Sequence, residues 1–372
     1  MDAQVSAHRG WVSKGLAIVP TEPWEQGGIK NFTAPAIPLG DGRWQLWYYA
    51  HPVDRKGSVL AVAEGVPGQN MRKTMLHRSA GEAARHGVER SLSNLPDGWQ
   101  PVQPVYLRLH NGTHRIYFWA HAPGIVRYLY ADSLDGLHFV VGDPHRPVLY
   151  HYHDRAVENG DLPHGLSIWG GAKEPRPAHE KAASVDLVCN DATNVHVLPD
   201  GSFELFTPTL LEVAKDSPQY IREDNAAGFI RVIDRLTSKD GIHFGDRVRV
   251  LERNENDPPG LQFYYLSVTR LGAKRLGLIG HYRADRQTLA IERAWSDDGI
   301  HWDRHEKVPW LDCGLQGEKD VYAALAPHSL VNDAGQWWCF YTGFNFLHNG
   351  QQSVGSALAS VLLASLDGIT EH

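Results

Sequence analysis

Apolar and aromatic runs alternate with short polar turns along the whole chain. Five strand-like runs each follow a turn of Gly, Asn or Asp residues, and they lie at 46–49, 116–119, 205–206, 276–279 and 337–341. Before each turn stands another run that ends in Pro or aliphatic residues. Gly, Asn and Asp supply the backbone conformations that tight turns require, so the pattern predicts short antiparallel strands in repeated units.

A second signal closes most of these units. The stretch Ser296-Asp297-Asp298-Gly299-Ile300-His301-Trp302 has relatives at 133–139, 238–244 and 365–369. Asp-Gly between two apolar runs is a strong hairpin signal, because Gly accepts a positive φ and Asp bonds the backbone that follows it. The first unit has Val66-Pro67-Gly68 at this place instead. We call the stretches at 133–139, 238–244 and 296–302 the Asp-Gly turns.

These signals predict an all-β chain. Each unit reads as strand, short turn, aromatic strand, loop, strand, Asp-Gly turn and strand, which is a four-stranded antiparallel sheet. Five such sheets in radial repetition form a five-bladed β-propeller, in which each sheet covers its neighbour's face. We therefore expect a single domain over 1–372 with blades at roughly 31–77, 100–150, 187–252, 262–308 and 321–368. The segment from Val12 to Val19 is expected to pair with the last blade and close the ring.

Loop lengths predict which face of the propeller carries the site. The turns after the first and third strands of each blade are uniformly short. Almost all long segments fall on the other face, at 78–99, 151–186, 207–228, 252–261, 309–320 and 342–353. Long loops on a rigid scaffold are where binding and catalytic groups usually lie. The Asp-Gly turns are therefore expected to be structural, and their His138, His243 and His301 to serve hairpin packing.

Composition limits the classes of partner. A net charge of -7 argues against a nucleic-acid or anionic-membrane binder, which needs a basic surface. No stretch approaches the ~20 apolar residues of a membrane span, and no signal peptide is evident at the start, which predicts a cytoplasmic protein. Cys189, Cys313 and Cys339 show no CxxC spacing, so neither a disulfide framework nor a zinc ribbon is expected. The oligomeric state stays open.

The chain resembles the five-bladed β-propeller glycoside hydrolase superfamily, with its arabinanase, xylosidase, invertase, levansucrase and mannoside phosphorylase branches. The resemblance rests on the Asp-Gly turns and on three further stretches, at 190–201, 257–264 and 341–345. It implies a hydrolase that cleaves a glycosidic bond of a small-molecule or oligosaccharide substrate, with paired carboxylates at the tunnel mouth and no cofactor. In such a pair one carboxyl group is protonated and the other ionised.

The resemblance places catalytic carboxylates at the start of inner strands. Asp191 is the first candidate, because Asn190 and Asn194 flank it and an apolar strand follows. Glu25 stands where the arabinanase and invertase pattern would have an Asp, and Asp320 precedes the last inner strand. The second blade offers no carboxylate at 101–106, so Glu174 in the 151–186 insertion is expected to supply a partner. Turn capping or an exposed loop position is the alternative for each of these residues.

Eight further residues near the expected mouth are candidate substrate contacts. Flat aromatic faces stack on sugar rings, and polar side chains bind hydroxyl groups. The candidates are Trp24, Asn31, Trp169, Asn194, Tyr264, His281, Arg283 and His328. For Arg283 a salt bridge with Asp285 is an equal alternative. His151 and His153 share a strand face, but two His make too small a ligand set, so no metal is predicted.

Two other functions remain open from the sequence. The missing first-blade Asp is compatible with a carbohydrate-binding propeller that has no catalytic activity. A lyase or cyclase that uses His281 or Tyr264 as its acid-base group is the third reading. For a glycosidase, a base carried on the loop 22–30 or 309–320 is expected to lie far from Asp191. The longer separation, roughly 6.5–9.5 Å, predicts inversion of the anomeric centre.

Overall fold

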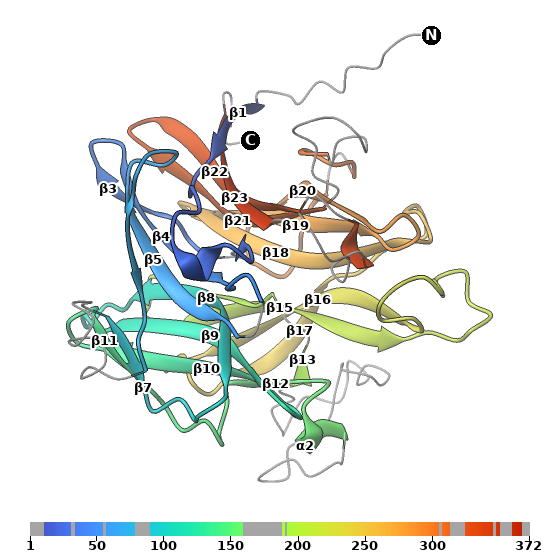
Figure 1. The fold of residues 1–372 in the computed structure, drawn as a ribbon. Helices are drawn as coiled ribbons and strands as arrows, with labels where there is room; N and C mark the ends of the chain where they lie inside the picture. Colours follow the sequence, from blue (N-terminus) through green and yellow to red (C-terminus); the bar gives the residue numbers. More distant parts are fainter. Residues whose placement is uncertain are drawn as a thin grey trace.

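The structure is a computed structural model, and it describes residues 11–30, 34–54, 57–78, 90–158, 188–189, 192–304, 307–312, 324–344, 347–349 and 359–366. The described chain is almost entirely strand, and its sheets are arranged as a propeller (Figure 1). The helical elements described are a 3-10 turn, η1 (Pro23–Glu25), and one turn of α-helix, α2 (Arg155–Glu158). The predictions of an all-β chain and of a propeller are confirmed. Neither of these helices is long and apolar enough to cross a membrane.

Three sheets follow one another along the first two thirds of the chain. The first contains β2 (Ile29–Lys30), β3 (Ile37–Gly40), β4 (Arg43–Ala50), β5 (Val59–Gly65) and β6 (Arg72–Met75). The second contains β7 (Ser91–Ser93), β8 (Gln100–Arg108), β9 (His114–Ala122), β10 (Ile125–Ser133), β11 (His138–Val141), β12 (Leu149–His151) and β13 (Val188–Cys189). The third contains β14 (Asn194–Val197), β15 (Phe203–Glu212), β16 (Phe229–Ser238) and β17 (Gly245–Leu251).

The remaining strands form one sheet of seven strands. They are β18 (Leu261–Leu271), β19 (Lys274–Arg283), β20 (Thr288–Ser296), β21 (Ala324–Asp333), β22 (Gln336–Phe344), β23 (Ala359–Leu366) and β1 (Trp11–Leu16). The described strands therefore fall into four sheets, and the prediction of five separate four-stranded blades is wrong in number. The reason is one parallel pair, Leu289 with Ala324, which joins β20 to β21.

Both ends of the chain contribute to this last sheet. β1 pairs antiparallel with β23, with Trp11 opposite Leu366 and Leu16 opposite Leu362. Figure 1 shows the blue β1 beside the red β23. The prediction that the segment from Val12 to Val19 closes the ring is confirmed for Val12 to Leu16.

Neighbouring sheets pack face to face through shared apolar clusters. Trp47 of β4 packs edge-on against Phe139 of β11, which joins the first and second sheets. Phe206 of β15 and Phe263 of β18 share a cluster between the third sheet and the last one. The first and last sheets meet through Trp44 and Phe340, whose ring centroids are 5.0 Å apart. Burial of large aromatic faces between blades is the main hydrophobic contribution that such a ring can make.

The three Asp-Gly turns have one common structure. Gly136, Gly241 and Gly299 have φ of 73°, 70° and 76°. In each turn the Ser hydroxyl accepts a bond from the Gly N–H, and the Asp carboxylate accepts bonds from the two N–H groups after the Gly. This is the hairpin that the sequence predicts, because local side-chain bonds hold the backbone at a positive φ.

Each Asp-Gly turn is also fixed by an arginine that links two neighbouring sheets. Arg90 bonds Glu64 of the first sheet and the carbonyl of Gly136. Arg115 of the second sheet bonds the carbonyl of Asp240, and Arg275 of the last sheet bonds Glu204 of the third sheet. We call the end of the propeller that carries these turns the rear end. The register places the connection 213–228 at the opposite end of β15 and β16, and we call that end the mouth.

Candidate functional site

The strands β8, β18 and β21 each carry a β-bulge in their pairing to the next strand, and the register also shifts in the pairs β3 with β4 and β16 with β17. The register shifts between Val102 and Val105 in β8, between Phe263 and Leu266 in β18, and between Pro327 and Ser329 in β21. The bulges therefore fall at Gln103 and Pro104, at Tyr264 and Tyr265, and at His328. Bulges redirect side chains and are common next to active sites.

Backbone strain accompanies the bulge in β8. Gln103 has φ of 55°, and Ala192, which precedes β14, has φ of 59°. Both residues are buried, and the Gln103 side chain accepts a hydrogen bond of 2.8 Å from the Ala192 N–H. This bond ties the second sheet to the third beside the position of Asp191. Non-Gly residues at positive φ cluster at functional sites, so the strain supports a site here.

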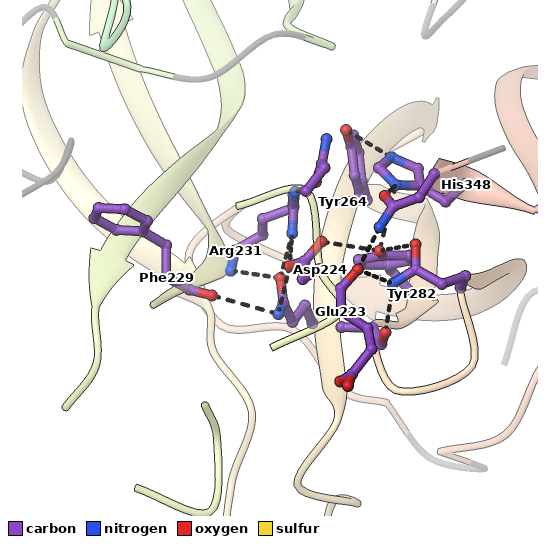
Figure 2. Close-up of polar contacts among 12 residues, drawn as sticks. Glu223, Asp224, Phe229, Arg231, Tyr264, Tyr282 and His348 are labelled. Carbon is purple, nitrogen blue, oxygen red and sulfur yellow. Dashed lines mark hydrogen bonds and ion pairs between the residues drawn. The ribbon is translucent and has the colours of Figure 1, made fainter. Parts of the chain in front are cut away.

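A buried polar cluster lies at the mouth between the third and last sheets (Figure 2). We call it the Arg231 cluster, and it comprises Asp224, Arg231, Gln262, Tyr264, Tyr282 and His348. Arg231 Nη1 lies 2.7 Å from Asp224 Oδ2, with both side chains only 1% exposed. The guanidinium carbon of Arg231 lies 4.7 Å from the ring centre of Tyr264 and 5.1 Å from that of Tyr282. Figure 2 shows these groups converging from separate strands and loops.

The hydrogen bonds of the Arg231 cluster form a chain in which each donor is followed by its acceptor. The Tyr282 hydroxyl donates to Asp224 at 3.0 Å and lies 3.3 Å from His348 Nδ1. His348 Nδ1 also faces the Asn349 Oδ1 acceptor at 3.2 Å. Because Nδ1 faces two oxygens, those of the Tyr282 hydroxyl and the Asn349 amide, we assign it the proton of the neutral imidazole. Nε2 then accepts a hydrogen bond from the Tyr264 hydroxyl at 3.0 Å. The chain of donors thus runs from Tyr264 through His348 and Tyr282 to Asp224.

The ionisation states agree with this direction. Burial lowers the pKa of His348 to about 4, which keeps its imidazole neutral near pH 7. Burial opposes the ionisation of Asp224, but Arg231 and the Tyr282 hydroxyl outweigh it and hold the pKa of this carboxyl below its ordinary value. Burial raises the pKa of Tyr282. Asp224 is therefore an ionised acceptor rather than a proton donor.

The Arg231 cluster was mostly missed by the sequence patterns. The sequence predicts Tyr264 as a substrate contact, but it does not predict a role for Asp224, Arg231 or Gln262. They come from the connection 213–228, from β16 and from β18, and no spacing in the sequence connects these segments. The position of Asp224 in a long connection at the mouth is a signal in the sequence for this site. It is a weak signal, because carboxylates are common in loops.

The predicted catalytic residues fall mainly outside the described chain. Asp191, Glu174 and Asp320 belong to those undescribed residues, and their roles stay predictions. Glu25 is described, buried in η1, and it accepts bonds from Lys73 Nζ at 2.6 Å and from the Tyr48 hydroxyl at 2.7 Å. It also accepts from two backbone N–H groups of the preceding turn. These contacts favour a structural role for Glu25.

The predicted substrate contacts are spread over several environments. Asn31 and Trp169 lie outside the described chain, and His328 is described only as a backbone position at the bulge of β21. Trp24 is partly buried and packs against the cluster between the first and last sheets. Asn194 is buried and donates to the carbonyl of Leu266, so it links β14 to β18. Tyr264 alone among the predicted contacts belongs to the Arg231 cluster.

His281 and Arg283 are engaged by carboxylates. His281 Nδ1 lies 2.7 Å from Glu292 Oε2, and Arg304 bridges Glu292 to Asp257 with distances of 2.7 and 2.8 Å. Arg283 forms a two-bond ion pair with Asp285, at 2.9 and 2.7 Å. The salt-bridge alternative for Arg283 is therefore the one that the structure contains. Because Nδ1 contacts Glu292, a lyase or cyclase mechanism would have to use the other ring nitrogen of His281 as its acid-base group.

The carboxyl groups of the described chain provide acceptors. Wherever a shift is resolved among them, the pKa lies below its ordinary value. For Asp234 burial opposes ionisation, but Arg247 and Arg249 outweigh it. A glycosidase needs one carboxyl whose pKa is raised to donate a proton. None of the resolved shifts provides such a donor among the described carboxyl groups, and Asp191, Glu174 and Asp320 lie outside that part of the chain.

Comparisons with known proteins connect this fold to carbohydrate chemistry. No family model and no curated protein sequence matches the chain. A solved structure described as a glycoside hydrolase matches with a TM-score of 0.61 and 12% identity, over 97% of this chain and 93% of that chain. The α-L-arabinofuranosidase PaAbf62A from Podospora anserina, in complex with cellotriose, matches with a TM-score of 0.56 and 13% identity, over 97% of each chain.

An enzyme of another reaction type shares the fold as well. An N-acetylgalactosamine deacetylase from F. plautii, in complex with blood group B trisaccharide, has a TM-score of 0.52 and 11% identity, over 96% of this chain and 95% of that chain. At such identities the likeness shows the fold alone. The resemblance to the propeller glycoside hydrolases is confirmed at that level. The reaction has to be argued from the site, because one fold hosts several chemistries.

Proposed function

We propose that this protein is a carbohydrate-active enzyme that cleaves a glycosidic bond at the mouth of the propeller. The observation that carries the proposal is the set of bulges in β8, β18 and β21, which interrupt the regular pairing at Gln103, at Tyr264 and at the backbone of His328. The shared fold with glycoside hydrolases supports it. Sugars are bound by such convergent hydrogen-bonding and aromatic side chains.

In this proposal Asp191 is one member of the catalytic pair. It directly precedes Ala192, whose positive φ and bond to Gln103 fix the backbone at the mouth. Its partner is Asp320 or Glu174, and Glu25 is disfavoured by its buried bonds to Lys73 and Tyr48. A partner borne on a loop favours the longer separation of roughly 6.5–9.5 Å, which leaves room for a water and inverts the anomeric centre.

Turnover of model substrates tests the proposed reaction. Aryl arabinosides, xylosides, fructosides and galactosides are incubated with the wild type, with Asp191→Asn and with Asp297→Asn. Asp297 is exposed in a rear turn, so its variant controls for loss of one charge. We expect Asp191→Asn to lose turnover by about 10²-fold or more while Asp297→Asn retains it. Proton NMR of the first-formed anomer tests inversion.

A binding protein without catalysis is the second candidate. It is favoured by the lowered pKa of buried carboxyl groups such as Asp224, Glu204 and Asp257, which makes them acceptors rather than proton donors. This candidate predicts that sugars bind to the wild type and to Asp191→Asn with similar affinity and that no panel member is cleaved. Calorimetric titration with the same sugars separates the two candidates. Cleavage that survives Asp191→Asn would contradict the assignment of Asp191.

A further inference from the structure

Three arginines surround one buried carboxylate at the rear end, between the third and last sheets. Glu204 of β15 has a fully buried side chain. Arg235 Nη2 and Arg275 Nε lie 3.0 Å from its oxygens, and Arg270 Nη1 lies 3.8 Å away. Within the described part of the chain, Glu204 is the carboxylate in ion-pair contact with these three groups. We call this set the Glu204 cluster.

The Glu204 cluster carries more positive than negative charge. Arg270 of β18 and Arg275 of β19 stand directly opposite each other in the strand register. Like charges at directly opposed positions destabilise a sheet unless a counter-charge is present. The neighbouring His196 adds no charge, because burial, reinforced by Arg270 and Arg275, lowers its pKa to about 4 and keeps its imidazole neutral near pH 7. Three guanidinium groups thus share one carboxylate in a protein whose net charge is -7.

One guanidinium nitrogen lacks an acceptor. Arg270 Nη1 is buried and has no hydrogen-bond partner in the described chain. A buried polar group without a partner costs free energy, on the order of 1–3 kcal/mol, and calls for an explanation. The Arg270 side chain is nevertheless 24% exposed, so part of it reaches solvent. A ligand can therefore approach Arg270 from outside.

The arginine clamp formed by Arg115 at the rear end has no such surplus. Arg115 forms a two-bond ion pair with Asp132, at 2.6 and 2.8 Å, and its remaining bonds go to the carbonyl of Asp240 and the Tyr117 hydroxyl. One guanidinium serves one carboxylate there. The extra arginines at Glu204 are therefore not needed to hold an Asp-Gly turn.

We propose that the Glu204 cluster binds a phosphate or sulfate group, free or as part of a larger anion. The planar guanidinium matches the spacing of two oxygens of such a group and bonds it with two parallel N–H donors. The anion would contact the exposed part of Arg270 and neutralise its repulsion with Arg275. Gly299 of the nearby Asp-Gly turn packs on the same arginines, so the ligand would also stiffen this junction between sheets.

This inference does not depend on the proposed glycosidase function, because the Glu204 cluster lies at the rear end. Thermal unfolding and calorimetric titration are measured with sodium phosphate, sodium sulfate and sodium chloride at equal ionic strength. We expect saturable binding of phosphate or sulfate and a rise in Tm of about 2–4 °C at a hundredfold excess over Kd. Chloride at the same ionic strength should give a smaller rise.

Arg270→Gln is the informative variant, and Arg286→Gln is its control. Arg286 is an exposed residue at the mouth, so its variant loses the same charge elsewhere. Without added anion, Arg270→Gln should be as stable as the wild type or more so, because a repulsion is removed. With phosphate or sulfate, only the wild type and Arg286→Gln should gain stability. Arg270→Lys keeps the charge without the planar fork and should bind more weakly.

Two results would overturn the proposal. One is an equal rise in Tm with chloride, which would show general screening only. The other is an anion response that Arg270→Gln retains in full. A sugar phosphate added to the series separates the sources of the anion: tighter binding than inorganic phosphate supports an esterified ligand, and equal or weaker binding supports the free ion.

Discussion

The rear end and the mouth of this propeller differ in whether their polar contacts are repeated from sheet to sheet. At the rear, one device recurs three times: a Ser hydroxyl, an Asp carboxylate and a Gly at positive φ form a hairpin, and an arginine joins it to the next sheet. At the mouth, the Arg231 cluster occurs once and draws on segments that share no pattern. The repeated chemistry holds sheets together, whereas the unrepeated chemistry is where a specific function can reside.

Loss of Arg231 should have the largest effect on stability. Arg231→Met leaves the ionised Asp224 buried without its main partner. Breaking a buried ion pair on one side costs about 3–5 kcal/mol of unfolding free energy, to be measured by urea denaturation. The double variant Asp224→Asn with Arg231→Met should recover part of the loss. A loss below about 1 kcal/mol in the single variant would mean that the pair is open to water.

A rear turn should be the next most sensitive place. Gly241→Val puts a branched side chain at φ of 70°, and its Cβ would come within 2.6 Å of the Tyr117 hydroxyl and 2.8 Å of the Phe203 ring. Strain and overpacking together should cost about 3 kcal/mol. Gly335→Val is the matched control, because Gly335 also has a positive φ but open space around its Cβ. Equal losses in the two variants would show that strain alone matters.

Acid should weaken the mouth through His348. Its pKa in the folded protein is about 4, below the ordinary value of 6.5, so the contribution of the neutral imidazole is complete above pH 6.5 and is lost as pH falls toward 4. This linkage amounts to at most about 3 kcal/mol of unfolding free energy. In His348→Gln the decline between pH 6.5 and 4 should be smaller by that amount. Identical pH profiles of the wild type and His348→Gln would mean that His348 is in contact with water.

Below this range Asp224 takes over. The folded pKa of Asp224 lies below its ordinary value of 3.8, so its stabilising effect is present above that value and is lost only as pH falls further. The difference in unfolding free energy between the wild type and Asp224→Asn should therefore be constant above about pH 4 and become smaller below it. The two variants together assign separate pH windows to two members of one cluster.

Loss of Arg283 should have the smallest effect on stability of all these changes. Its ion pair with Asp285 is partly exposed, and exposed pairs contribute about 0–1 kcal/mol. Arg283→Gln should thus change the unfolding free energy by less than about 1 kcal/mol and leave sugar binding intact. Loss of sugar binding at unchanged stability would restore Arg283 as a substrate contact and extend the site beyond the Arg231 cluster.

The parts of the fold that local chemistry controls were predictable. The Asp-Gly turns follow from side-chain bonds within four residues, and β1 follows from an apolar run at the start of the chain. The number of sheets could not be predicted, because it depends on a single long-range contact, the parallel pairing of Leu289 with Ala324. The contacts of Glu25 could not be predicted for a similar reason, since its partner Lys73 lies 48 residues further along the chain. The Arg231 cluster requires knowing which loops meet at the mouth.

The pairing of β1 with β23 has a consequence for how the chain folds. Most neighbouring strands are joined by short connections, but this pair joins residues more than 340 positions apart in the sequence. Closing so long a loop costs roughly 3 kcal/mol more chain entropy than closing a ten-residue hairpin. The ring should therefore close last, after the hairpins have formed. Until then the free edge of β23 is an exposed template for a strand of another molecule, so the pairing of β1 with this edge protects the protein against aggregation during synthesis and refolding.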